Sequence, residues 1–165
     1  MTPDIPATPS VAHSKSRPGR KSRRYCAREL VLQGIYQWRV TGGTVAFIEA
    51  QLRDTDEFQK ADGKYFSNLL RHVLNSIEAL EEKIQPCLDR PLKELSPVEY
   101  AILLMSTCEL VHFPDIPYRA VINEAIELAK SYGGSEGYKY VNGVLDKLAV
   151  QLRATEIGQQ FKPTR

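Results

Sequence analysis

Cysteine, histidine and long apolar runs are all scarce in this chain of 165 residues. The three cysteines, Cys26, Cys87 and Cys108, are widely spaced and form no C-x-x-C pair, so we expect neither a disulfide framework nor a zinc site. The three histidines are equally dispersed, and we predict no bound metal and no cofactor. No apolar run approaches the ~18–20 residues that span a bilayer, and no secretory signal is present. The sequence therefore predicts a cytoplasmic protein without a membrane partner.

Motifs of catalytic sites are missing as well. The sequence contains no H-E-x-x-H, no G-x-S-x-G and no complete phosphate-binding P-loop. Residues 19–22 (GRKS) resemble the end of a P-loop, but they lack the upstream glycine and a preceding strand. Pairs such as Glu124 and Glu127 have the chemistry of an acid and a base, yet nothing in the local sequence indicates the burial that would tune their acidity. We predict no catalytic residues and a protein that is not an enzyme.

Positive charge is concentrated near the N-terminus. Between Ile5 and Arg28 there are seven lysines and arginines and no acidic residue, although the whole chain has a net charge of only +2. The rest of the chain therefore carries about −5, by subtraction from +2. A basic arm on a mildly acidic body suggests a polyanionic partner, although a solvated, solubilising leader has the same composition.

Helical periodicity dominates the chain from about residue 21 onward, and no segment shows the alternation of a strand. The fourth helix has the clearest start, because Ser96, Pro97 and Glu99 form a capping-box sequence. We predict an all-α fold of two three-helix sub-bundles that share one core. The expected helices cover about 21–40, 44–53 and 64–84, a segment that begins at Ser96, 118–132, and a segment that begins near Ser135. The expected domains are a disordered basic arm (1–20), a helical domain (21–156) and a flexible C-terminal tail (157–165).

Four separate blocks of this sequence resemble the NusB family of bacterial transcription antitermination factors, over roughly residues 23–149. The N-terminal block fits the family pattern R-x-x-A-R-E…Q-x-x-Y-x-W, and the C-terminal block runs from Asp115 to Leu148. The matching residues are Arg24, Arg28-Glu29, Gln33 and Tyr36-Gln37-Trp38, then Tyr65-Phe66, Pro86 and Ser96-Pro97-Val98-Glu99, and finally DIPYRAVINEAIELAKSYGG with SEGYKYVNGVLDKL.

The resemblance implies binding to the boxA element of ribosomal RNA leader transcripts. It implies two partners, the ribosomal protein NusE and the RNA polymerase antitermination complex, in a monomer or a homodimer. Lysines and arginines suit phosphates, and tyrosines suit stacking of unpaired bases, although core packing is the alternative for each tyrosine. Tyr25 and Cys26 interrupt the family's arginine run, so we expect basic contacts to move outward to Lys21 and Arg23. The expected RNA-binding residues are Lys21, Arg23, Arg24, Arg28, Gln33, Tyr132, Glu136, Lys139 and Tyr140.

A second surface is implied for NusE, with Tyr36, Glu94 and Glu99 at the matching positions. Acidic side chains there suit a basic ribosomal protein. Two other functions remain compatible with the sequence. One is the NusB-like RNA-binding module of some ribosomal RNA methyltransferases, which continue into a Rossmann-like domain for which no room is expected before Arg165. The other is a purely structural helical adaptor with an idle basic tail.

Overall fold

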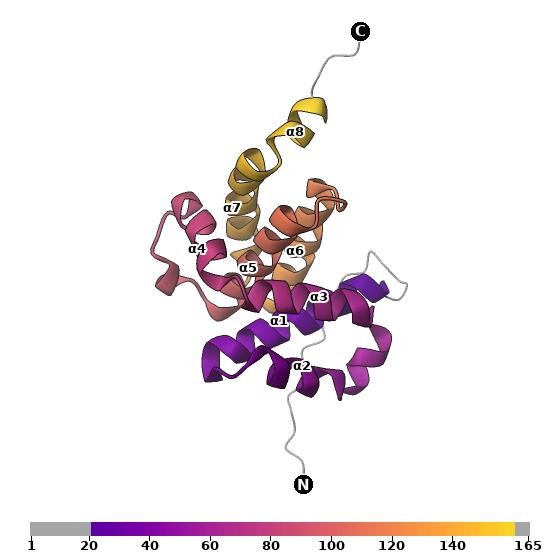
Figure 1. Cartoon of the computed structure of the whole chain (residues 1–165). Coiled ribbons are helices and arrows are strands. Elements are labelled where there is room, and N and C mark those ends of the chain that lie inside the picture. Colours follow the sequence, from indigo (N-terminus) through magenta and orange to yellow (C-terminus); the bar gives the residue numbers. More distant parts are fainter. Residues whose placement is uncertain (1–20, 161–165) are drawn as a thin grey trace.

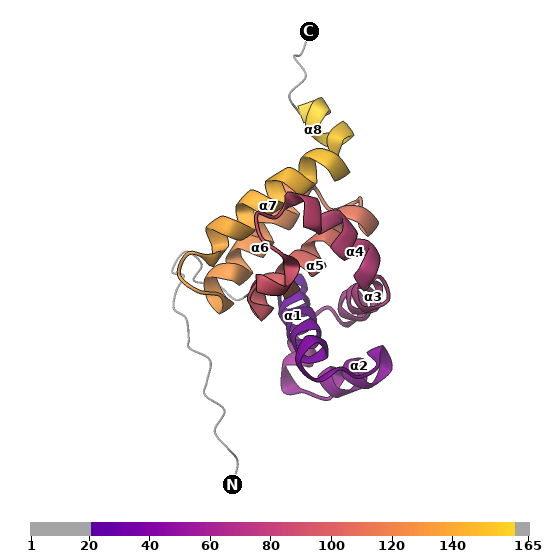
Figure 2. The ribbon, with the colours of Figure 1, turned by 90° about the vertical axis from the view of Figure 1, so that its left-hand side faces the viewer.

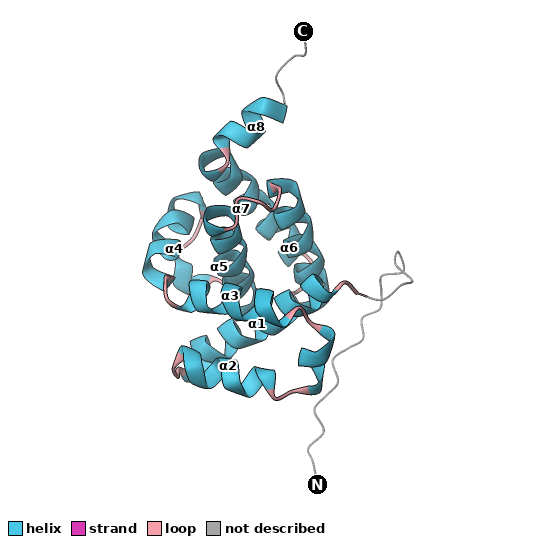
Figure 3. Cartoon of the chain, turned by 45° about the vertical axis from the view of Figure 1, so that its right-hand side comes forward, coloured by secondary structure: helices cyan, strands magenta, loops and turns pink. Residues whose placement is uncertain are grey.

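Helices make up most of residues 21–160, the part of the chain that the computed structural model describes, and no strand occurs within them (Figure 1, Figure 3). The predicted all-α fold is thereby confirmed. Among these residues, no helix has the length and apolar character of a membrane span. The elements are α1 (Arg23–Thr41), α2 (Val45–Arg53), η1 (Asp56–Lys60), α3 (Gly63–Leu74), α4 (Ile77–Ile84), η2 (Gln85–Cys87), η3 (Leu92–Glu94), α5 (Pro97–His112), α6 (Tyr118–Tyr132), α7 (Gly137–Leu152) and α8 (Ala154–Gln160).

Helix α5 lies between the two halves of the molecule. It contacts α1 and α3 on one side and α4, α6 and α7 on the other (Figure 2). Every residue from Tyr100 to Leu110 is buried, so α5 has no solvent face along this stretch. Val98, in the first turn of α5, is only half-buried. A helix that is covered on both sides buries its whole circumference instead of one apolar stripe.

The predicted helix over 64–84 is wrong in one respect, because two helices occupy this range. Helix α3 ends at Leu74 and α4 begins at Ile77, with Asn75 and Ser76 between them. Asparagine and serine are weak helix formers because their side chains compete for backbone hydrogen bonds. The Ser76 N–H donates to the Val73 carbonyl at 3.1 Å, which closes a tight turn. The apolar spacing continues in phase across this turn, so periodicity alone did not indicate it.

The short C-terminal helix α8 was not predicted, and the domain boundary expected at residue 156 falls inside it. Buried Arg153 joins α7 to α8: its Nε donates to the Leu110 carbonyl at 2.9 Å, and its guanidinium pairs with Glu156 at 2.5 Å. Glu156 also accepts the Tyr118 N–H at 3.0 Å. These bonds fix the start of α8 against α5 and α6. The predicted arm (1–20) and the end of the predicted tail (161–165) lie outside the described residues.

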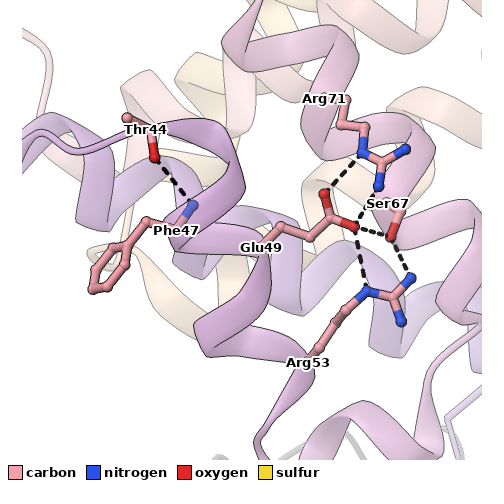
Figure 4. A network of polar contacts seen from close by, with 6 residues as sticks. All are labelled: Thr44, Phe47, Glu49, Arg53, Ser67 and Arg71. Atoms are coloured by element: carbon pink, nitrogen blue, oxygen red, sulfur yellow. Dashed lines mark hydrogen bonds and ion pairs between the residues drawn. The ribbon is translucent and has the colours of Figure 1, made fainter.

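A polar network ties α2 to α3 in the N-terminal half (Figure 4). The Glu49 carboxylate, largely buried, accepts from Arg71 Nε at 2.8 Å, Ser67 Oγ at 2.6 Å and Arg53 Nε at 3.3 Å. Burial opposes ionisation, yet these hydrogen bonds, Arg71 first, hold the pKa of Glu49 below its usual value. Glu49 is therefore ionised, and its hydrogen bonds hold α2 against α3.

Candidate nucleic-acid interface

The start of α1 meets the end of α6 in one polar cluster. Ser22 caps α1 by accepting the Tyr25 N–H at 2.9 Å, which satisfies a backbone donor in the first turn of the helix. One carboxylate oxygen of Glu29 accepts both the Tyr132 hydroxyl at 2.7 Å and the Lys21 ammonium at 2.8 Å. Two of the expected RNA-binding residues, Lys21 and Tyr132, are thus brought together although they are far apart in the sequence. Burial and Glu29 raise the pKa of Tyr132, so its hydroxyl stays a donor.

The sharp corner between α6 and α7 positions two more of the expected RNA-binding residues, Glu136 and Lys139. A Cβ at Gly133 would lie 2.8 Å from the Ala129 carbonyl oxygen, so only glycine fits where α6 ends. Helix α7 begins at Gly137 rather than near Ser135, with Glu136 as its N-terminal flanking residue. Lys139 and Glu136 form an exposed ion pair at 2.9 Å, and both side chains are therefore accessible at this corner.

Tyr140 lies against the loop between η2 and η3. Its hydroxyl donates to Asp89 at 3.2 Å, and the Arg90 guanidinium lies over its ring, 4.2 Å from the centroid. Arg90 also pairs with Asp89 at 2.8 Å. The ring is half-buried, which agrees with the expectation that it points partly outward. Sequence reasoning missed Asp89 and Arg90, because a short loop with a charged pair carries no distinguishing pattern.

The arginines at the start of α1 are not equivalent. Arg23 donates to the Ala61 carbonyl at 2.8 Å and so anchors the segment after η1. The Arg24 guanidinium stacks on the Tyr65 ring at 4.2 Å, while the residue as a whole is exposed. Arg28 is 4 % exposed, which does not fit the phosphate contact expected for it. Gln33, one turn further along, is exposed.

Arg28 has a structural partner inside the protein. Its Nε donates to Glu109 of α5 at 2.8 Å, and the Tyr65 hydroxyl donates to the same carboxylate. Burial raises the pKa of Glu109, and the Arg28 charge and the Tyr65 hydrogen bond oppose that rise. No local pattern indicates this triad, because Arg28 and Glu109 are 81 positions apart in the sequence. Arg28 thus supports the basic surface from beneath instead of forming part of it.

The three residues expected to bind a protein partner lie on α1, η3 and α5. Tyr36 is 45 % exposed and Glu94 is exposed. Glu99 is half-buried and completes the predicted capping box, in which its N–H donates to Ser96 Oγ at 3.1 Å. A Cβ at Gly137 would lie 3.1 Å from Glu99 Oε2. Glu99 therefore borders the first turn of α7, next to the candidate RNA residues, and the two candidate surfaces share an edge.

Residues 21–160 form a small all-α protein, and its candidate interface is an open, polar surface. Within residues 21–160, no group of three or more histidine, cysteine, aspartate or glutamate side chains is placed to hold a metal ion. The chain belongs to the NusB family, whose model matches residues 26–150.

Similar proteins include the transcription antitermination protein NusB of Nitrosospira multiformis. It is 68% identical over 134 residues, which cover 81% of this chain and 85% of the relative. The protein of the same name from Nitrosomonas eutropha is 58% identical over 160 residues, covering 97% of this chain and 92% of the relative.

Solved structures share the fold. T. maritima NusB superposes with a TM-score of 0.72 at 28% identity, covering 84% of this chain and 99% of that one. A chain in the crystal structure of antitermination factors NusB and NusE in complex with double-stranded RNA gives a TM-score of 0.69 at 22% identity, covering 75% of this chain and 93% of that one.

Proposed function

We propose that this protein is a transcription antitermination factor that binds boxA-type RNA of ribosomal RNA leader transcripts together with NusE, a small-subunit ribosomal protein. It acts without catalysis, as a component of the RNA polymerase antitermination complex in the cytoplasm. Relatives named transcription antitermination protein NusB, 58–68% identical, support this assignment. The observation that carries it is the junction at the end of α6. Tyr132 and Lys21 meet there through Glu29, and the corner into α7 leads to Lys139 and Tyr140.

This junction has the chemistry that single-stranded RNA requires. Lys21, Arg24 and Lys139 offer positive charge for phosphates. Tyr132, 44 % exposed, and Tyr140 offer rings on which unpaired bases stack, each stack contributing ~1–3 kcal/mol. Arg23 and the exposed Gln33 border this surface, and Arg28 braces the helix beneath it. Glu136 lowers the local positive charge and neutralises Lys139 in the free protein.

Removing two exposed cations from this surface should weaken RNA binding at every sequence. The variant Arg24→Ala with Lys139→Ala should reduce the slope of log affinity against log salt by up to ~1.4, at ~0.7 for each lost phosphate contact on single-stranded RNA. Fluorescence anisotropy of a labelled boxA-type strand, measured from low to physiological salt, gives both quantities. Lys83→Ala with Lys147→Ala is the matched control, because both lysines are exposed and lie on α4 and the distal half of α7.

An unchanged affinity and slope in the Arg24 and Lys139 variant would place the RNA elsewhere. Absence of salt-dependent binding in the unaltered protein would favour the structural adaptor.

A duplex of the same sequence is the comparison ligand. Unstacked bases are needed for contacts with Tyr132 and Tyr140, so the single strand should bind more tightly.

Reversing the charge of Glu99 should abolish or strongly weaken binding to NusE. Glu99→Lys places like charge against a basic ribosomal protein, whereas affinity for RNA alone should be unchanged or slightly higher. Because Glu99 also caps α5, losing it costs α5 a few tenths to ~1 kcal/mol. Glu99→Gln retains most of this cap and serves as the control. Calorimetry with purified NusE measures the effect, and normal NusE binding by Glu99→Lys would show that the partner's surface lies elsewhere.

A further inference from the structure

Glu29 is an acidic residue in the middle of the surface proposed for RNA. Its side chain is 17% exposed and faces two residues of that surface, Lys21 and Tyr132. Lys21 also lies 5.7 Å from the centre of the Tyr25 ring. A carboxylate in this position is unexpected for a phosphate-binding surface, because it repels the ligand and occupies a cation that the ligand needs.

The two hydrogen bonds of Glu29 have opposite consequences for RNA. The bond to the Tyr132 hydroxyl, at 2.7 Å, fixes the orientation of a partly exposed ring, which lowers the entropy lost when a base stacks on it. The ion pair with Lys21, at 2.8 Å, must break before Lys21 reaches a phosphate. One side chain thus prepares the stacking platform and withholds a cation.

We infer that Glu29 is an internal competitor of the RNA backbone: it holds Lys21 and orients Tyr132 in the free protein, and an RNA phosphate replaces it at Lys21 on binding. This inference rests on the proposed function and adds a positioning residue to it. When Lys21 moves to the phosphate, Glu29 is left without its cation and takes up a salt cation instead. The wild-type protein therefore releases fewer counterions on binding than its phosphate contacts alone would give.

Glu29→Gln separates the two consequences, because the amide oxygen still accepts from Tyr132 but carries no charge. This variant should bind a boxA-type single strand about two- to five-fold more tightly at low salt, the range for freeing one partly exposed ion pair. Its salt slope should become steeper by up to ~0.7. Glu29→Ala frees Lys21 as well but leaves Tyr132 without its acceptor, so its gain should be smaller.

The anisotropy experiment compares Glu29→Gln in the wild-type protein and in the Lys21→Ala variant. Lys21→Ala has no ion pair to break, so adding Glu29→Gln to it should not increase RNA affinity beyond the effect of the net charge. Glu82→Gln measures that effect, because Glu82 is an exposed carboxylate on α4 and its replacement changes the net charge equally. A full gain in the Lys21→Ala background, or no gain in the wild-type background, would overturn the competition. Equal gains for Glu29→Gln and Glu29→Ala would contradict the orienting of Tyr132. Failure of the wild-type protein to bind the strand would instead count against the proposed function.

Discussion

Replacing Arg28 with methionine should lower the free energy of unfolding by about 3–5 kcal/mol, the usual cost of removing one partner of a buried ion pair. Glu109, 1 % exposed, would keep its place in the core without its guanidinium partner. Tyr65 would remain as a hydrogen-bond donor, but a phenol supplies no compensating charge. Urea denaturation followed by circular dichroism measures the loss. A decrease below ~1 kcal/mol would mean that Arg28 lies in contact with water.

The double variant Arg28→Met with Glu109→Leu is the informative control. It removes both charges together, so its loss of stability should be smaller than that of Arg28→Met alone. Arg24→Ala gives the second comparison. Arg24 lies about one turn before Arg28 on α1, but it is exposed and stacks on Tyr65. Its effect on stability should stay within ~1 kcal/mol, the range for a cation–aromatic contact at an exposed site.

Leu145→Ala should lower the free energy of unfolding by about 2–5 kcal/mol. Leu145 of α7 is fully buried in the core, so its truncation leaves a cavity as well as losing apolar contacts. Val150→Ala, on the same helix but 60 % exposed, should change stability by less than ~0.5 kcal/mol. Chemical denaturation of the two variants side by side measures the difference. Similar losses in both would contradict the assignment of the α7 face that packs inward.

Most of the fold follows from local patterns in the sequence. The capping box at Ser96 and Glu99, which the sequence predicted, is present in the structure. Gly42 and Gly133 at helix ends and the apolar spacing of α7 are equally local features, because each acts over a single turn or helix face. The break between α3 and α4 was missed because both helices keep the same buried phase. Helix α8 depends on Arg153 reaching back to α5, a contact between distant segments that no local pattern encodes.

The sequence predicted which types of residue the candidate interface contains, but not which side chains contact one another. Lys21 and Tyr132 meet at Glu29, and Lys139 and Tyr140 lie at the start of α7. Whether a charged side chain faces water or a buried counter-charge depends on the tertiary fold. Arginine at position 28 has the same sequence signature as its exposed neighbours, yet it points to a glutamate 81 positions away. The contact between Glu29 and Tyr132 also joins residues far apart in the sequence, 103 positions, so no local pattern encodes it.

The central position of α5 has a consequence for how the molecule comes apart. Both halves bury their apolar faces against this one helix, so neither retains a closed core when the other separates from it. Small single domains of this kind lose structure in one all-or-none transition instead of passing through a half-folded state. The innermost amides of α5 should accordingly open only with the whole chain, whereas the ends of the molecule open locally at much lower cost.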